Sequence, residues 1–119
     1  MAYNIYVENA QGESIVSFGE SVRSRLMFSD LWKMHKQGKV KRTAGVCHLQ
    51  EIYTLDNHVA VALLVGHIEK ELEILKSYLD EPEGKYENQK DRFRCYEKNL
   101  DSWKNLMDEV LIFEVWDTS

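Results

Sequence analysis

Four histidines and two cysteines are the residues of this sequence best suited to chemistry, and several of them lie close together. Cys47 and His48 are neighbours, while His58 and His67 flank an apolar run. Glu71 follows His67 by four residues, so the two side chains would share one face of a helix and could chelate one metal ion. A stable metal site needs three or four ligands, however, and the sequence has no second such pair, no HExxH and no CxxC motif. We therefore expect no metal and no cofactor, with His58 lining a core and His67 near solvent.

The two cysteines are weak candidates for catalytic nucleophiles. Cys95 falls inside an expected helix, where neither a helix N-terminus nor an obvious histidine would activate its thiol. Cys47 lies beside His48, but the surrounding residues match no known nucleophile signature. Glycine motifs that bind phosphate, GxGxxG and GxxxxGK[ST], are absent from the sequence. We predict that the protein is not an enzyme; the alternative is a small ligand- or metal-binding enzyme that uses Cys47, His48 and His67 in one pocket.

A basic stretch, KMHKQGKVKR, covers residues 33–42. Its cations could bind phosphate groups, as nucleic-acid-binding surfaces do, or an acidic protein. Cations at the end of a helix also stabilise the helix dipole, and the protein is acidic as a whole, so we do not expect nucleic acid as the main partner. The alternative function for this stretch is that of a nucleic-acid-associated regulator. The residues assigned to a phosphate or acidic-partner contact are Lys33, Lys36, Lys39, Lys41 and Arg42.

Carboxylates crowd a second segment, DEPEGKYE, at residues 80–87, and others precede it. At the tip of a helical hairpin these charges would suit docking onto a basic surface, because opposite charges steer two proteins together. Toxin-immunity proteins and phage anti-defence proteins are the classes we consider. We expect a small acidic intracellular interaction protein that binds and blocks a basic macromolecular partner, most simply a protein. The residues assigned to partner binding are Glu69, Glu73, Asp80, Glu81, Glu83 and Glu87.

Aromatic residues and compensated charges refine this expectation. Interfaces often use large aromatic side chains as anchors, and four are available for that role: Tyr53, Tyr78, Tyr86 and Trp116. Oppositely charged residues three apart on a helix attract each other. The pairs expected on this basis are Glu73 with Lys76, Asp91 with Arg94, and Asp101 with Lys104.

The N-terminal third of the sequence predicts a β-hairpin followed by a helix. YNIYVEN and SIVSF have the β-branched and aromatic residues of strands, and Asn9 and Gly12 between them suit a turn. The apolar residues of the next segment recur at helical spacing between Ser21, a suitable start, and Gly38, a suitable stop. We expect residues 39–45 to form a loop and residues 46–55 a short helix.

The centre of the sequence predicts two long helices joined by a short loop. Asp56 can cap the first of these helices. The apolar residues of that helix then recur at alternating spacings of four and three, as they do along the seam between two packed helices. The valines of 59–65 would also suit a buried strand, but the seam continues through Gly66, so we favour a helix. Pro82 and Gly84 end the first helix. The expected seam residues are Val61, Val65, Ile68, Leu72, Leu75 and Leu79, and, in the second helix, Tyr86, Phe93, Tyr96, Leu100, Trp103, Met107 and Val110.

The last apolar segment, LIFEVWDTS, predicts a strand that joins the N-terminal hairpin. We therefore expect a single α+β domain over residues 1–119: a small antiparallel sheet, formed by the N-terminal hairpin and the C-terminal strand, packed with a long antiparallel helical hairpin and one or two shorter helices. No signal peptide, membrane span or disulfide framework is evident, so we expect a cytoplasmic monomer or homodimer with no membrane partner.

Net charge is unevenly distributed along the chain. Residues 1–45 carry seven Lys or Arg against four Asp or Glu, whereas residues 46–119 carry eight against sixteen. Charge distribution governs partners and association rates more than it governs the fold. The asymmetry therefore indicates an interaction surface.

Overall fold

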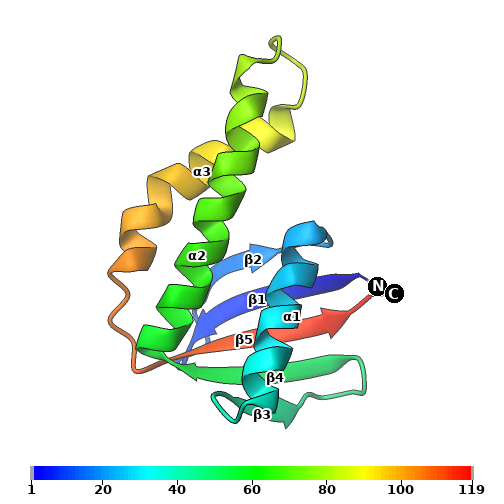
Figure 1. Cartoon of the computed structure of the whole chain (residues 1–119), viewed down its shortest axis with the longest axis vertical. Coiled ribbons are helices and arrows are strands. Elements are labelled where there is room, and N and C mark those ends of the chain that lie inside the picture. Colours follow the sequence, from blue (N-terminus) through cyan, green and yellow to red (C-terminus); the bar gives the residue numbers. More distant parts are fainter. Residues whose placement is uncertain (1, 119) are drawn as a thin grey trace. The chain divides into compact units, whose positions relative to one another are not determined.

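The structure, a computed structural model, describes residues 2–118. Within these residues the chain forms five strands, three α-helices and one 3-10 helix, and this confirms the predicted α+β class (Figure 1). In chain order the elements are β1 (Tyr3–Asn9), β2 (Ser14–Phe18), α1 (Val22–Lys36), β3 (Lys41–Ala44), β4 (Gln50–Asp56), α2 (Asn57–Leu75), the 3-10 helix η1 (Lys76–Asp80), α3 (Glu87–Lys104) and β5 (Val110–Asp117).

The elements belong to two compact units. The sheet unit contains the five strands, α1 and the first residues of α2, as far as Ala60. The hairpin unit is Val61–Leu106 and contains the rest of α2, η1 and α3. The expectation that residues 1–119 form a single domain stays a prediction.

The five strands form one antiparallel sheet in the order β2-β1-β5-β4-β3. The C-terminal strand β5 pairs with β1 from Tyr3, opposite Asp117, to Asn9, opposite Leu111, which confirms that it joins the N-terminal hairpin. The Thr118 N–H donates to the Ala2 carbonyl oxygen at 3.0 Å, so the two ends of the described chain lie side by side (Figure 1). Because β5 is central, the sheet is complete only when the last segment of the chain is in place.

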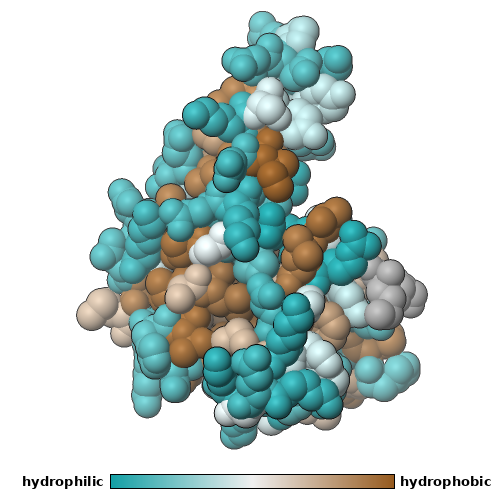
Figure 2. Space-filling view, viewed as in Figure 1, coloured by the Kyte–Doolittle hydropathy of each residue, from teal (hydrophilic) through white to brown (hydrophobic). Residues whose placement is uncertain are grey.

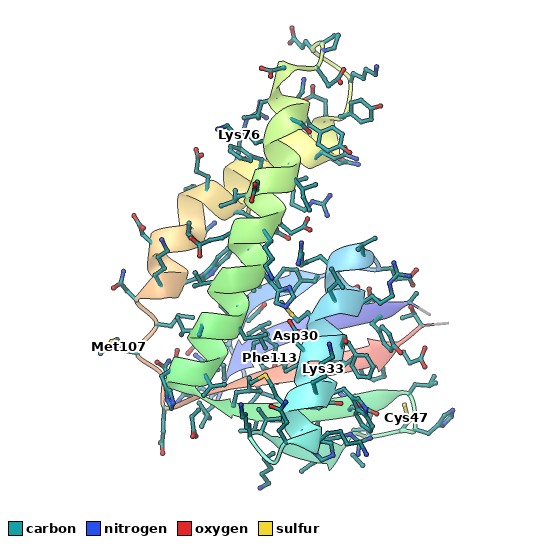
Figure 3. All side chains as sticks on the ribbon, in the orientation of Figure 1. Asp30, Lys33, Cys47, Lys76, Met107 and Phe113 are labelled. Atoms are coloured by element: carbon teal, nitrogen blue, oxygen red, sulfur yellow. The ribbon has the colours of Figure 1, made fainter. Side chains whose placement is uncertain are left out.

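One face of the sheet carries α1, and the side chains between them form the core of this unit (Figure 1). In a strand, alternate residues point to the same face. Phe113 on β5 lies beside α1 in Figure 3 and is fully buried. The apolar residues of this unit with an exposed fraction of 2% or less are Ile5, Val7, Met27, Leu31, Tyr53, Leu55, Ala60, Leu111, Phe113 and Val115.

Helix α1 begins and ends where the sequence predicts. Ser21 caps it, since its hydroxyl accepts the Ser24 N–H at 3.1 Å while the Ser24 hydroxyl accepts the Ser21 N–H at 3.1 Å. Gly38 has a φ of 73°, a left-handed conformation that costs glycine little, and its N–H donates to the His35 carbonyl oxygen. Both boundaries are therefore confirmed by local hydrogen bonds.

The predictions for residues 39–55 are wrong: strands β3 and β4 replace the expected loop and short helix. Tyr53 and Leu55 of β4 are buried and pair across to Phe113 and Leu111 of β5, almost 60 residues further along the chain. Glu51 occupies the inward position before them, so a polar residue interrupts the alternation that would have identified a strand. The edge strand β3 is exposed and carries charged residues, as unpaired sheet edges commonly do.

The two long helices of the centre are confirmed. Helix α2 begins at Asn57, directly after Asp56, and includes residues 59–65, which are therefore helical. Helix α3 follows an irregular loop, and the two helices run antiparallel within the hairpin unit (Figure 1). They have 19 and 18 residues, and so are nearly equal in length, as predicted.

The buried face of α2 differs from the predicted seam. His67 and Glu71 are 3% and 8% exposed, so the expectation that His67 lies near solvent is wrong. His58 is exposed, so its predicted core position is wrong as well. The apolar run allows more than one buried face, and the face in the structure is turned by about one residue. The buried positions of α2 are Ala60, Leu64, His67, Ile68, Glu71 and Leu75, whereas Val61, Val65 and Leu72 are half-buried.

In α3 the seam prediction is confirmed in part. Tyr96 and Trp103 are 5% and 6% exposed and meet edge to face, with their ring centroids 6.0 Å apart. Tyr86 and Met107 are 41% and 91% exposed, so their predicted seam positions are wrong. Both residues flank the helix, where the heptad spacing no longer applies.

Candidate functional site

The acidic hairpin surface consists of the six predicted carboxylates Glu69, Glu73, Asp80, Glu81, Glu83 and Glu87, and all of them belong to the hairpin unit. Two lie on α2, one at the end of η1, two in the following loop and one at the start of α3. Five are exposed and Glu81 is half-buried. Figure 2 shows hydrophilic side chains over the end of the hairpin where this loop lies. Four of the six therefore lie at the tip of the hairpin, whereas Glu73 and Glu69 lie further down α2, and Glu69 is close to Lys104 at the end of α3 away from the loop.

Lys90, which the sequence analysis did not single out, fixes the loop beneath these charges. It is 5% exposed, and its ammonium donates to the carbonyl oxygens of Glu81 at 2.7 Å and Pro82 at 3.1 Å. It also lies 3.5 Å from the Glu87 carboxylate. A lysine in the first turn of a helix is an ordinary surface residue by sequence, and only the folded loop brings the two carbonyls to it.

Glu87 closes the same loop from the other side. Its Oε1 accepts the Gly84 N–H at 2.9 Å, and Gly84 has a φ of 85°. The hydrogen bond from Gly84, with the charge of Lys90, holds the pKa of Glu87 below its usual value. Glu87 therefore acts in part as a structural residue of the loop.

Three of the six carboxylates are paired with cations and three are not. Lys85 lies 3.6 Å from Glu81, Lys90 lies 3.5 Å from Glu87, and Lys104 lies 4.0 Å from Glu69. In the part of the chain that the structure describes, Glu73, Asp80 and Glu83 make no hydrogen bond or ion pair through their side chains. These three carboxylates are consequently available to a partner.

Of the three ion pairs expected from sequence, one is confirmed. Arg94 donates to Asp91 at 3.1 Å. Glu73 and Lys76 are not within ion-pair distance, and Lys104 pairs with Glu69 of the other helix rather than with Asp101. Proximity in sequence permits such a pair, but the orientation of the side chains decides it.

The predicted aromatic anchors are differently exposed. Tyr53 is fully buried, so its predicted role as an anchor is wrong. Tyr86 is exposed at the start of α3, and its ring lies 5.0 Å from that of Tyr78. Trp116, on β5, is half-buried and donates to Glu114 at 2.7 Å. Tyr86, next to the acidic loop, is therefore an exposed aromatic side chain beside the carboxylates.

The basic surface consists of Lys33, Lys36, Lys39, Lys41 and Arg42, and it lies in the sheet unit. These residues lie on the end of α1, on strand β3 and between the two, and two of them, Lys36 and Arg42, lie against the ring of the half-buried Trp32. Lys36 Nζ lies 4.7 Å and the Arg42 guanidinium 5.4 Å from the centroid of this ring, and the His35 ring is 5.5 Å away. Figure 3 shows Lys33 on the same helix. Contacts of this kind hold cations against an aromatic face.

Arg42 connects this surface to a polar network on β4. Its guanidinium donates to Glu51 Oε1 at 2.7 Å, and the Tyr53 hydroxyl donates to Glu51 Oε2 at 2.5 Å. Burial would raise the pKa of Glu51, but these two hydrogen bonds, with the charges of Arg42 and His35, outweigh it and hold the pKa below its usual value. Burial and the bond to Glu51 raise the pKa of Tyr53. Glu51 is therefore held as a carboxylate.

The residues of the alternative enzyme hypothesis belong to different units. His67 is buried in the hairpin unit, whereas Cys47 and His48 are in the loop between β3 and β4 of the sheet unit (Figure 3). Cys47 is an exposed free thiol, as is Cys95 of α3. His48 lines a small cavity of about 100 Å³, together with Tyr3, Phe28, Leu49, Glu51, Val115 and Asp117. This cavity, which the sequence analysis did not foresee, joins residues from both ends of the chain.

Within the residues that the structure describes, neither a metal cluster nor a membrane span is found. Between residues 2 and 118 no group of three or more His, Cys, Asp or Glu side chains is placed to hold a metal ion. None of the helices described is both long and apolar enough to cross a membrane. Comparison with protein-family models, with curated proteins and with solved structures found no match for this chain. The function is therefore argued from the surfaces of the molecule itself.

Proposed function

We propose that the protein is a non-catalytic interaction protein of the cytoplasm, which binds and blocks a basic partner protein through the acidic hairpin surface. The observation that carries the proposal is the set of three exposed carboxylates, Glu73, Asp80 and Glu83, that no cation within residues 2–118 neutralises. A partner that brings Lys or Arg side chains would pair them and would be steered toward them over a longer range. Inhibitors of the toxin-immunity or phage anti-defence type are the class we propose.

The loop beneath these carboxylates supports the same function. Lys90 and Glu87 hold its backbone through hydrogen bonds to Glu81, Pro82 and Gly84. A segment that is already ordered loses less conformational entropy when a partner binds than a mobile one does. The exposed ring of Tyr86 adds apolar area beside the charges.

The proposal is tested by reversing charge at the tip. The Asp80→Lys, Glu83→Lys double variant and the wild-type protein would each be used to capture proteins from the native host, and the captured partner would then be purified. We expect the purified partner to bind wild type with an affinity that falls steeply as salt increases, and to bind the tip variant at least tenfold more weakly, measured by calorimetry.

A matched control separates the tip from net charge. The Glu20→Lys, Glu97→Lys variant makes the same change of charge at two exposed positions away from the loop. Wild-type affinity in this control, with loss in the tip variant, supports the proposal. Equal loss in both variants, or no loss in either, contradicts it.

One observation favours a second function, binding of an anionic ligand at the basic surface. Lys36 and Arg42 lie against the half-buried Trp32, and cations beside an aromatic ring are a common arrangement for nucleic-acid or phosphate contacts. The Lys36→Gln, Lys39→Gln, Lys41→Gln variant should then elute earlier from heparin and lose binding to a fluorescent oligonucleotide. The variant Lys70→Gln, Lys76→Gln, Lys98→Gln has the same net charge and should behave as wild type; if the two sets behave alike, this function is excluded.

A further inference from the structure

The cavity of the sheet unit has a buried floor, and both apolar and charged side chains line it. Tyr3 and Val115 form the floor and are 6% and 2% exposed. Phe28 of α1 lies against the floor, with its ring centroid 4.3 Å from that of Tyr3 and the planes inclined by 31°. The exposed residues His48 and Leu49 lie at the rim. The space is thus closed below by aromatic and aliphatic groups and is open toward the loop that carries the rim.

The rim is tied to the rest of the cavity by a backbone hydrogen bond. The Asp117 N–H donates to the Leu49 carbonyl oxygen at 2.8 Å, so the end of β5 holds the loop between β3 and β4 in place. Phe28 also has its ring 6.4 Å from that of Tyr53. The cavity is therefore built from the start of β1, α1, the loop between β3 and β4, β4 and the end of β5.

Two carboxylates, of Glu51 and Asp117, line this cavity. Arg42 and Tyr53 each use one lone pair of Glu51, and a carboxylate oxygen can accept a second hydrogen bond. Burial first, and then the charges of Asp117 and Glu51, raise the pKa of Tyr3 on the floor. Both carboxylates therefore act on Tyr3, while Arg42 is bound to Glu51.

We propose that this cavity binds the cationic head of an alkylguanidinium or alkylammonium compound, with Glu51 and Asp117 as its carboxylate partners and Phe28 and Tyr3 as its aromatic wall. A cation beside aromatic faces gains attraction from the ring quadrupoles, and paired carboxylates neutralise it. Water occupies about 30 Å³ per molecule in the liquid, so a cavity of about 100 Å³ suits a head group of three or four heavy atoms. The head group could come from a free amine or from a basic side chain of a protein.

This inference concerns the sheet unit and does not depend on the function proposed for the hairpin. It is tested by titrating the full-length, ¹⁵N-labelled protein with N-acetyl-arginine amide and following the amide resonances. We expect saturable shifts at Tyr3, Leu49, Glu51 and Asp117. The citrulline analogue has the same shape without the charge, and it should cause no saturable shift.

Two variants and one control complete the test. Asp117→Asn removes one carboxylate charge and should weaken arginine amide binding at least tenfold, and Phe28→Leu should weaken it less. Asp108→Asn makes the same chemical change before β5 and should leave binding unchanged. The spectra also report whether each variant is folded. Equal shifts with citrulline, shifts that do not saturate, or wild-type affinity in folded Asp117→Asn and Phe28→Leu would each overturn the inference.

Two further probes identify the source of the head group. Agmatine represents a free small amine, and an arginine-containing peptide of ten residues represents a protein side chain. Tighter binding of agmatine than of the peptide indicates a small-molecule ligand, and the reverse indicates a protein. If neither probe binds at millimolar concentration, the inference is wrong.

Discussion

The acidic hairpin surface and the basic surface around Trp32 are both charged, yet they are built in different ways. Around the hairpin loop the contacts join residues close in sequence: Glu87 to Gly84 and Lys90, and Lys85 to Glu81. Around Trp32 the contacts of Lys36 and His35 lie within α1, but Arg42 of β3 joins this helix to the sheet and reaches Glu51 on a neighbouring strand. The first kind of surface follows from local chain geometry, whereas the second requires a folded sheet.

The two surfaces also differ in how their charges are satisfied. Three hairpin carboxylates have cationic partners and three do not. On the basic surface only Arg42, among the residues described, pairs with a carboxylate, and Lys36 instead lies on an aromatic ring. Each surface therefore retains charge that a partner could neutralise. This is why the two binding functions are tested with separate sets of variants.

The largest effect is expected in the sheet core, on which the basic surface depends. Phe113 is fully buried on the central strand, so Phe113→Ala should lower the free energy of unfolding by about 3 to 5 kcal/mol, measured by urea denaturation. Ile112, the half-buried neighbour of Phe113, points to the other face of the sheet, so Ile112→Ala should lower the free energy of unfolding clearly less. Equal losses would mean that the α1 face of the sheet is not the main core.

The next effect tests whether the hairpin loop depends on one buried cation. Lys90→Met keeps an apolar stem but removes the donor to two carbonyl oxygens, and it should lower the free energy of unfolding by about 2 kcal/mol. Amide hydrogen exchange in residues 81–86 should accelerate as well. Lys98→Met, at an exposed position of the same helix, is the control; similar behaviour of the two variants would show that Lys90 is not structural.

A smaller effect is expected from the ion pair that joins the two strands. Arg42→Gln should raise the pKa of Glu51 and cost about 0.5 to 1 kcal/mol at pH 7, since the pair is only partly buried. A lowered folded-state pKa stabilises the protein above the unfolded value of about 4.3. That contribution is lost as the pH falls through the folded-state pKa. Urea denaturation of both proteins from pH 7 to pH 3 should show their difference shrinking below about pH 4; a difference that stays constant would contradict the assignment.

The smallest effect is expected from the local pair on α3. Arg94 and Asp91 are 62% and 72% exposed, so Arg94→Gln should change the free energy of unfolding by at most about 0.5 kcal/mol. It is the same substitution as Arg42→Gln, in a pair formed within one helix. Urea denaturation in low and high salt should show little difference in stability between Arg94→Gln and wild type. A loss of unfolding free energy as large as that of Arg42→Gln would remove the distinction between local and long-range pairs.

The parts of the fold predicted from sequence are those with local signals. Ser21 and Gly38 bound α1 through hydrogen bonds within the helix termini, and Pro82 and Gly84 interrupt the hairpin. Strands β3 and β4 were missed because β4 gains its stability from β5, far away in sequence. The buried face of α2 was predicted wrongly because an apolar run offers several equivalent faces. His67 was expected near solvent because it is polar, but it is buried.

The same distinction between local and long-range contacts applies to the candidate sites. The six carboxylates of the acidic hairpin surface were assigned to partner binding from their type and from their position in or before a loop, both visible in the sequence, and that assignment stays a prediction. Lys90 was missed because its role depends on carbonyls that only the folded loop presents. The cavity beside Glu51 was missed because it brings Tyr3 together with Asp117, residues at opposite ends of the chain.

The sequence by itself determined the α+β class, the two long helices, the strand that returns to the N-terminal hairpin and the separation of charge between the two parts of the chain. These properties depend on periodicity, turn residues and composition, which act over a few residues. Only the tertiary structure decided the order of the five strands, the buried face of α2, the cations around Trp32 and the cavity between Tyr3, Glu51 and Asp117. Those features depend on which distant segments pair, because burial and hydrogen bonding across strands outweigh local preference.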